Sequence, residues 1–168
     1  MASRLSAVIR KAGAALKEFT QLQASRKRTR DGHRPDALNP RPKAGGARLG
    51  YAPSPGHTAD PGEIVWTWVP YEDDPSQGKD RPVLIIGTEG SVLLGLMLTS
   101  RDRNNESGRD EGYIDIGTGA WDRKGRESEV YLDRVLRVDP PAVRRIGAVL
   151  HRSRFEKVID GLERRAGR

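Results

Sequence analysis

Short segments in which hydrophobic and polar positions alternate begin at Glu63, and this period-two pattern predicts β-strands. In the first segment, Glu63–Val69, isoleucine and tryptophan alternate with valine and threonine. Both faces of this strand carry residues that favour β-structure, which is typical of a small closed barrel. Further strands are predicted over residues 81–86, 91–100, 113–116 and 129–138. Since these five strands are closely spaced with no helix between them, the pattern predicts an antiparallel barrel.

The residues after the fifth predicted strand favour helix. Pro140 and Pro141 stand in a predicted first helical turn, where a missing N–H group costs no hydrogen bond. Residues 146–150 then predict one more strand. Ser153 and Glu156 have the spacing of a capping box, in which each side chain bonds the backbone N–H of the other. The apolar stripe of a closing helix follows as Phe155, Val158, Ile159 and Leu162.

The first 30 residues show helical rather than strand periodicity. Apolar residues recur at helical spacing between lysines and arginines, which predicts a basic amphipathic helix over residues 1–30. Two interpretations stay open: a helix that docks on a partner or an anionic membrane surface, and a marginal helix interrupted by Gly13. Arg10 and Lys11 interrupt the apolar run that a secretion signal needs, so a cytoplasmic protein is expected.

Residues 31–60 separate this helix from the predicted strands. Six prolines and six glycines fall between residues 31 and 62. This density opposes regular hydrogen bonding and leaves little apolar surface to offset the entropy of ordering, which predicts a disordered linker. The predicted organisation is therefore a helix over 1–30, a linker over 31–60 and a folded domain over 61–165.

The distribution of charge and of aliphatic residues supports this division. The formal net charge of the 168 residues is +7. Residues 1–60 carry 12 Lys/Arg against 4 Asp/Glu, whereas residues 61–168 carry 18 against 19, a net charge of −1. Leu, Ile and Val number 7 before residue 61 and 26 after it, so only the second segment can bury a substantial core.

Composition also narrows the chemistry. The chain has no cysteine, which excludes disulfides, thiol nucleophiles and Cys-type zinc sites. Its three histidines are far apart in sequence, so neither a metal site nor another cofactor is expected. The sequence lacks the GxxxxGK[ST], GxGxxG, GxSxG and HExxH motifs, which removes support for nucleotide hydrolysis, dinucleotide binding and the common hydrolases.

Polar residues at the ends of the predicted strands are the remaining candidates for chemistry. Arg81 opens one strand, Thr99 and Ser100 close the next, and Asp133 lies inside a later apolar run. A guanidinium and a hydroxyl suit a phosphate group, and a carboxylate suits a general base. An enzyme that cleaves RNA needs to supply little more than these groups, because the 2′-OH of the RNA itself is the nucleophile. The structural interpretation is that these residues satisfy turns and a local salt bridge.

Several stretches of the folded segment, in their order and spacing, carry a family resemblance. They read PGEIVWTWVPYEDDPSQGKDRPVLIIG, LLGLMLTS, VYLDRVLRVD and RRIGAVL, and the terminal helix follows. The most specific pieces are Gln77-Gly78 shortly before Arg81-Pro82, and Leu98-Thr99-Ser100 at the next strand end. From about Pro61 to Leu162, the chain resembles the PemK/MazF family of toxin endoribonucleases.

This resemblance implies an SH3-like barrel with a C-terminal helix, usually a homodimer, that cleaves single-stranded mRNA at short sequences without a metal. It also implies growth arrest and a cognate antitoxin protein that blocks the RNA groove. Arg81 matches the family arginine at the scissile phosphate, and Thr99 matches the threonine that contacts this phosphate. Asp133 stands where some members use an aspartate as base. The candidates for RNA binding are Gln77, Lys79, Ser100, Trp121 and Arg134.

Two departures and two alternatives accompany the resemblance. Tyr131 replaces an arginine that some members carry, and the first loop lacks the histidine of others. Trp121, in the stretch from Thr118 to Ser128, has two interpretations: a base-stacking residue beside basic side chains, or a packed anchor of the loop. The alternative to an enzyme is a non-catalytic module of the same fold that binds nucleic acid or protein, since the folded segment is nearly neutral.

Overall fold

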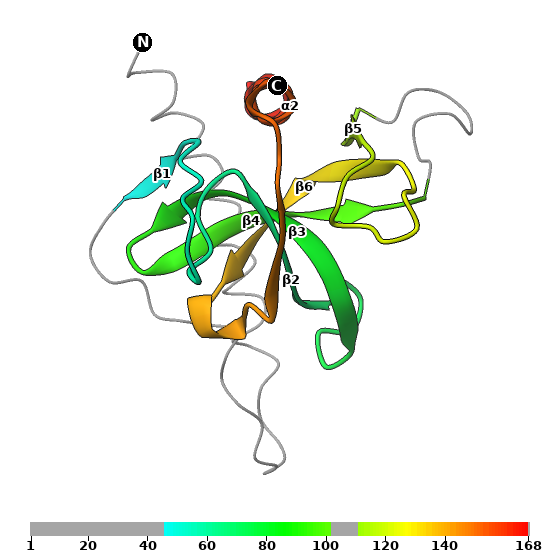
Figure 1. Ribbon diagram of the computed structural model, residues 1–168. Helices are drawn as coiled ribbons and strands as arrows, with labels where there is room; N and C mark the ends of the chain where they lie inside the picture. The colour runs from blue at the N-terminus through cyan, green and yellow to red at the C-terminus, as the bar shows by residue number, and fades with distance from the viewer. Residues whose placement is uncertain (1–45, 102–110, 168) are drawn as a thin grey trace.

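An antiparallel sheet and one long helix form the domain (Figure 1). The computed structural model describes residues 46–101 and 111–167. Within these ranges the strands pair in the order β5-β6-β4-β3-β2-β7, and β1 pairs with β3. The elements are β1 (Ala47–Leu49), β2 (Glu63–Pro70), β3 (Gly78–Glu89), β4 (Val92–Thr99), β5 (Tyr113–Gly117), β6 (Ser128–Val138), the 3-10 turn η1 (Pro140–Ala142), β7 (Arg145–Val149) and α2 (Arg152–Ala166).

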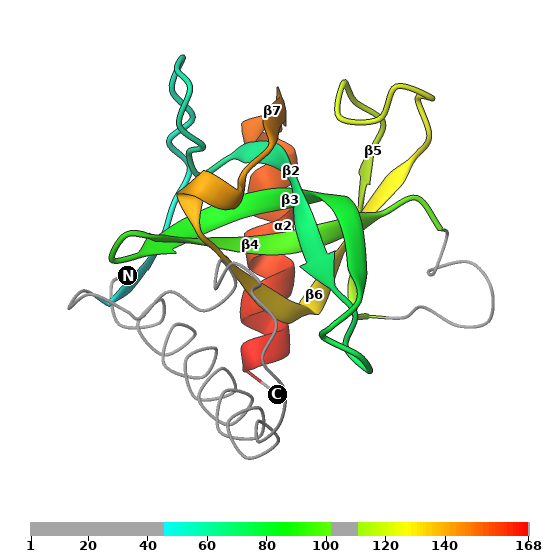
Figure 2. The same cartoon turned by 90° about the horizontal axis from the view of Figure 1, so that it is seen from below.

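Five of these strands curve into a small barrel. The run β6-β4-β3-β2-β7 has β6 and β7 at its two ends, and the short connection through η1 joins these ends (Figure 2). Side chains on one face of this run pack together, which places one hydrophobic cluster inside the curve. This cluster contains Val65, Val69, Val83, Ile85, Leu93, Leu136 and Val138. The predicted mainly β fold with a C-terminal helix is confirmed.

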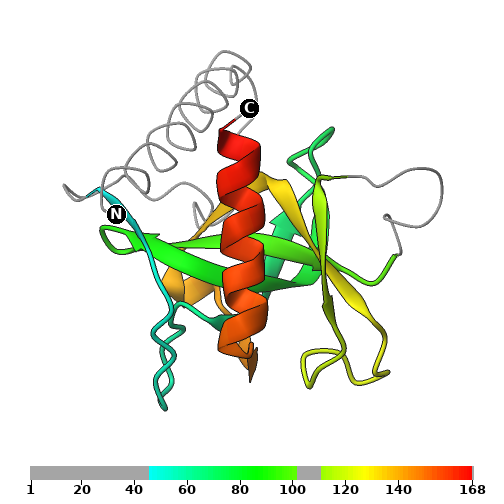
Figure 3. The ribbon, with the colours of Figure 1, turned by 90° about the horizontal axis from the view of Figure 1, so that it is seen from above.

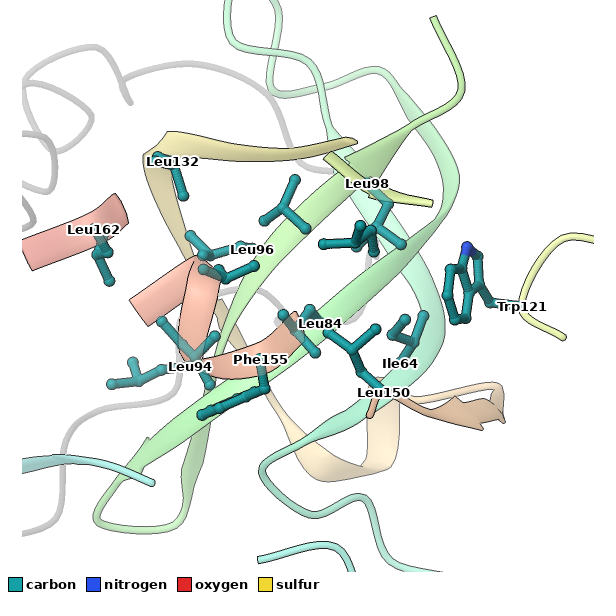
Figure 4. Packing of buried hydrophobic residues seen from close by; sticks show 14 residues of the cluster. Ile64, Leu84, Leu94, Leu96, Leu98, Trp121, Leu132, Leu150, Phe155 and Leu162 are labelled. Carbon is teal, nitrogen blue, oxygen red and sulfur yellow. The ribbon is translucent and has the colours of Figure 1, made fainter. Parts of the chain in front are cut away.

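A second, larger cluster lies between the sheet and α2. Figure 3 shows α2 lying across one face of the sheet, and Figure 4 shows Phe155 and Leu162 of α2 together with Leu94, Leu96 and Leu132 of the sheet. Burial of each such side chain contributes about 1.5–3 kcal/mol, so the apolar stripe predicted for the closing helix holds it in place. Neither α2 nor another helix in the described part of the chain is long and apolar enough to cross a membrane.

The start of α2 differs from the predicted capping box. His151 is the N-cap, and its Nδ1 accepts a hydrogen bond from the backbone N–H of Ser153 at 3.3 Å. Glu156 instead lies 3.9 Å from the guanidinium of Arg152, one turn before it. The helix begins at Arg152, one residue before the predicted cap, because the Nδ1 of His151 accepts the otherwise unpaired N–H of the first turn, as a hydroxyl would.

The strand limits are close to those predicted, except in β3. This strand begins at Gly78 rather than Arg81, because its ladder with β2 extends to the pair Pro70↔Gly78. Pro82 was expected at the beginning of its strand or at an edge, and it lies inside β3. The ladder between β3 and β4 begins one residue later, at Val83↔Met97, so Pro82 has no ladder partner on the β4 side.

Part of the predicted disordered linker is ordered. β2 pairs with β3 only as far as Leu84. Beyond this point the same edge of β3 pairs with β1, opposite Gly87 to Glu89. Tyr51 follows β1, and its hydroxyl donates to the carbonyl of Leu150 at 2.9 Å. The prediction for residues 46–60 was wrong because composition does not register one short strand and one aromatic anchor. The predicted helix over 1–30 and the rest of the linker lie outside the described residues.

Candidate active site

A hollow of about 590 Å³ opens where β3 and β4 approach the end of their ladder. Arg81 and Thr99 each lie two residues beyond the pair Val83↔Met97, Arg81 before Val83 and Thr99 after Met97. Because side chains alternate along a strand, both project to the same face at the same end. The lining comprises Trp66, Tyr71, Lys79, Asp80, Arg81, Pro82, Met97, Leu98, Thr99, Ser100, Arg101, Tyr113, Trp121, Asp122, Arg126 and Ser128.

The hydroxyl of Thr99 has a defined hydrogen-bond arrangement. Its Oγ1 accepts a hydrogen bond from the backbone N–H of Arg101 at 3.1 Å. A hydroxyl has one proton and two lone pairs, so the proton of Thr99 is available for an acceptor in the hollow. Thr99 and the neighbouring Arg81 together offer a hydroxyl and a guanidinium to one anion, which is the arrangement a phosphate binds.

Positive charge dominates the hollow. Lys79, Arg81 and Arg101 form no ion pair with residues 46–101 or 111–167. The two carboxylates of the lining are both neutralised: Asp80 lies 3.1 Å from Arg144, and Asp122 lies 2.8 Å from Arg126. No three acidic or histidine side chains in the described part gather as ligands of a metal ion. The hollow therefore attracts anions.

Arg134 lies near Arg81 without lining the hollow. Its Nη1 donates to the carbonyl of Pro70 at 2.8 Å and lies 4.0 Å from Glu72. Burial lowers the pKa of Arg134; Glu72 and Tyr131 raise it in part, and the positive charge of Arg81 lowers it. Arg134 therefore ties β6 to the end of β2 and adds a second cation close to Arg81, a position that favours anions still more.

Gln77 has a structural partner instead of a place in the lining. Its side-chain nitrogen donates to the carboxylate of Asp74 at 2.8 Å. The same carboxylate accepts from the Ser76 hydroxyl at 2.6 Å and from the Ser76 backbone N–H at 3.0 Å. These bonds hold the pKa of Asp74 below its ordinary value, with the Ser76 hydroxyl as the largest cause. Gln77 was predicted to bind RNA. Its side chain instead bonds Asp74 within the loop between β2 and β3, and it does not line the hollow.

Asp133 lies outside the lining of the hollow. Its carboxylate, about one third exposed, forms an ion pair with the guanidinium of Arg165 on α2. The expected role of Asp133 as general base therefore has no support in the geometry. The reason is a break in the ladder: β4 and β6 shift register between Leu96 and Leu98, and no pairing partner is assigned to Asp133 there.

Trp121 is a packed anchor of its loop. The residue is only 3% exposed and belongs to the large hydrophobic cluster, although it is also one of the lining residues. Its indole N–H donates to the hydroxyl of Ser128 at 3.0 Å. A ring this deeply buried offers no open face to a nucleobase, so the structure supports the second of the two interpretations given above.

Sequence reasoning missed several lining residues. Trp66 reaches the hollow because the β2–β3 register sets it opposite Pro82, and Arg145 lies 4.7 Å above its ring. Tyr113 lies opposite Tyr131 on β5 and β6, and their rings stack at 5.0 Å. Arg101 and Tyr71 are two more lining residues that were missed. Arg101 could have been predicted from its proximity in sequence to Thr99. The sequence holds no such signal for Trp66, Tyr71 or Tyr113.

Comparison with protein families identifies the domain. The family model described as "PemK-like, MazF-like toxin of type II toxin-antitoxin system" matches residues 60–164, more than half of the chain. The chain belongs to the PemK/MazF toxin family. The matched range begins close to the predicted domain start and ends within α2, so β1 and Tyr51 lie before the matched residues.

Solved structures were compared as well. Two crystal structures of MazE-MazF from Deinococcus radiodurans, Form-III and Form-II, are each 18% identical to this chain, with TM-scores of 0.47 and 0.48. The alignments cover 65% and 67% of this chain and 96% and 98% of those chains. Comparison with curated protein sequences gives no match.

Proposed function

We propose that this PemK/MazF domain is a toxin endoribonuclease that cleaves single-stranded mRNA at short sequences. The observation that carries the proposal is the shared position of Arg81 and Thr99 in one cationic hollow. Family membership supports the toxin class. In the cell we expect cleavage to arrest growth in the cytoplasm.

The proposed reaction uses the nucleophile that RNA carries. The ribose 2′-oxygen attacks the adjacent phosphorus, the bond from phosphorus to the 5′-oxygen breaks, and the products are a 2′,3′-cyclic phosphate and a 5′-hydroxyl. In net terms one proton leaves the 2′-OH and one reaches the 5′-oxygen. Arg81 stabilises the negative charge that grows on the nonbridging oxygens, and the Thr99 hydroxyl donates a hydrogen bond to one of them.

The other polar side chains around the hollow extend the binding of RNA along its backbone. Lys79 and Ser100 line the hollow beside Arg81 and Thr99. Arg134, which donates to the carbonyl of Pro70, adds positive charge near Arg81. Contacts with successive phosphates do not depend on sequence, so these residues set affinity and register rather than base choice.

Partners follow from the same proposal. A type II toxin is held inactive by an antitoxin protein, and we propose that the antitoxin covers the cationic hollow with acidic residues. We also propose that the functional unit is a homodimer, as the family resemblance implies.

The alternative function is a binding module without catalysis. It is favoured by the net charge of −1 over residues 61–168, which makes the domain as a whole a weak attractor of polyanions. Four of its cations nevertheless line the hollow, where Arg81 and the Thr99 hydroxyl suit phosphoryl chemistry.

Incubation of the purified full chain with a long RNA in the presence of EDTA tests the proposal. Sequencing of the new ends should show recurrent cleavage at one short motif. Arg81→Ala should lower the rate about 100-fold or more, the usual effect of removing one charge-stabilising donor, without changing the melting temperature. Arg48→Ala removes the same charge from an exposed position on β1 and should cleave normally. Binding without new ends would support the module instead.

A further inference from the structure

Four aromatic side chains line the hollow, and three of them are engaged by the protein. Trp121 is buried and bonded to Ser128, Tyr113 stacks on Tyr131, and Trp66 has Arg145 over its ring. The fourth is Tyr71. Its side chain has no hydrogen bond or ring contact with any residue of 46–101 or 111–167, and the residue is 37% exposed.

The backbone of Tyr71 is fixed although its ring is open. Its N–H donates to the carbonyl of Gln77 at 2.9 Å, which closes the loop between β2 and β3. The preceding residue, Pro70, accepts a hydrogen bond from Arg134, and Asp74 holds the far side of the loop through Ser76. Little backbone freedom is left to lose when a ligand binds, so Tyr71 is a preorganised platform at the rim of the hollow.

We propose that Tyr71 stacks a nucleobase next to the phosphate held by Arg81 and Thr99, and so contributes to the choice of the cleavage motif. This inference rests on the proposed ribonuclease function. A tyrosine ring presents a flat apolar face at low entropic cost, and unstacked bases of single-stranded RNA bind such faces. Phosphate contacts alone carry no sequence information, so a base platform supplies what Arg81 and Thr99 lack.

Trp68 provides a matched control. It is 39% exposed, lies three residues before Tyr71, and is absent from the lining of the hollow. If exposed aromatic area alone attracted RNA, Trp68 and Tyr71 would contribute equally. If a place in the lining of the hollow matters, only Tyr71 contributes.

The experiment first maps the motif cut by the wild-type chain and shows its loss in Arg81→Ala. Tyr71→Ala, Tyr71→Leu, Tyr71→Phe and Trp68→Ala are then compared by sequencing the new ends. The same proteins are titrated with the mapped oligonucleotide carrying a 2′-deoxyribose at the cleavage position, which prevents attack. A 2-aminopurine next to that position reports stacking by loss of its fluorescence.

We expect Tyr71→Ala and Tyr71→Leu to bind this oligonucleotide about 10-fold more weakly, to quench the probe less and to relax one position of the motif. Tyr71→Phe and Trp68→Ala should behave like the wild type. Wild-type motif and affinity in Tyr71→Leu would overturn the inference while leaving the ribonuclease proposal intact. An equal loss in Trp68→Ala would also overturn it. Loss of antitoxin binding with unchanged RNA binding would assign Tyr71 to a protein partner instead.

Discussion

The carboxylate of Asp133 on β6 is paired with the guanidinium of Arg165 near the end of α2. Two further side chains of α2 reach the neighbouring segment: Arg154 donates to the carbonyl of Thr118, and Lys157 donates to the carbonyl of Asp115, both at 3.0 Å. The helix thus holds the β5–β6 hairpin, which brings Tyr113 and Ser128 to the hollow. The Asp133–Arg165 ion pair is therefore one of the contacts by which α2 holds this hairpin.

We predict that Asp133→Ala and Arg165→Ala behave alike. The pair is partly exposed, so each substitution should lower the free energy of unfolding by at most about 1 kcal/mol. Cleavage should continue at nearly the wild-type rate in both variants. Urea titrations and single-turnover assays of the two variants and their double mutant measure this. A large loss of rate in Asp133→Ala alone would restore the aspartate as the base.

Tyr51 should be important for stability although it precedes the PemK/MazF match. Tyr51→Phe removes the hydrogen bond to the Leu150 carbonyl and should cost about 1 kcal/mol. Tyr51→Ala also removes the edge contact with Phe155, at 5.2 Å between ring centroids, and should cost about 2–3 kcal/mol. Urea denaturation measures both values. Wild-type stability in Tyr51→Ala would mean that this segment does not support α2.

Gly87→Ala should displace β1, the strand that precedes Tyr51, because Gly87 lies on β3 directly against the backbone of β1. A Cβ at Gly87 would clash with the carbonyl oxygen of Arg48, a backbone atom that cannot move without displacing β1. We expect faster hydrogen exchange of the Gly50 amide, which donates to Ile86. Gly125→Ala meets nothing within 4 Å and, despite its positive φ, leaves β1 untouched, so it is the comparison for this measurement. Unchanged exchange at Gly50 would contradict the close approach.

Acid should loosen the loops around the hollow in a defined pH range. Asp74 and Asp122 have pKa values below the ordinary 3.8, held down chiefly by Ser76 for Asp74 and by the Lys124 N–H for Asp122. Since the folded pKa is depressed, the stabilisation is complete above pH 3.8 and is lost as the pH falls through the lower folded value. The amide shifts of Ser76 and Lys124 should therefore titrate below pH 3.8. The Ser76 titration should vanish in Asp74→Asn, and a midpoint above 3.8 would contradict the loop geometry.

The local sequence pattern predicted most strands and the closing helix. These elements are determined by the alternation of hydrophobic and polar residues and by prolines and glycines that end them. The strand Glu63–Val69 and the apolar stripe of α2 are visible in the sequence, since each buries one or two faces with a fixed period. β1 was not visible. Three residues carry no period, and β1 forms only because β2 leaves the edge of β3 unpaired after Leu84.

The site divides in the same way. The shared position of Arg81 and Thr99 was predictable because Thr99 ends β4 and Arg81 lies on β3 two residues before the first β3–β4 pair, so the register alone brings the two side chains together. Asp133 and Trp121 were not, because their surroundings depend on contacts across the fold: a register shift sets Asp133 beside α2, and a hairpin folds Trp121 into the core. Residue type suggests chemistry, but only burial decides whether a ring or a carboxylate is accessible.

Trp121 gives a final prediction that separates packing from RNA binding. Trp121→Ala should cost about 3–5 kcal/mol of folding free energy, because it leaves a cavity in the cluster and an unpaired Ser128 hydroxyl. Trp121→Leu retains part of the volume and loses the aromatic face. If the ring only packs, folded Trp121→Leu should bind the uncleavable oligonucleotide with wild-type affinity, as Trp68→Ala should. Weaker binding by this variant, at a temperature where circular dichroism shows it folded, would return Trp121 to the RNA-contacting residues.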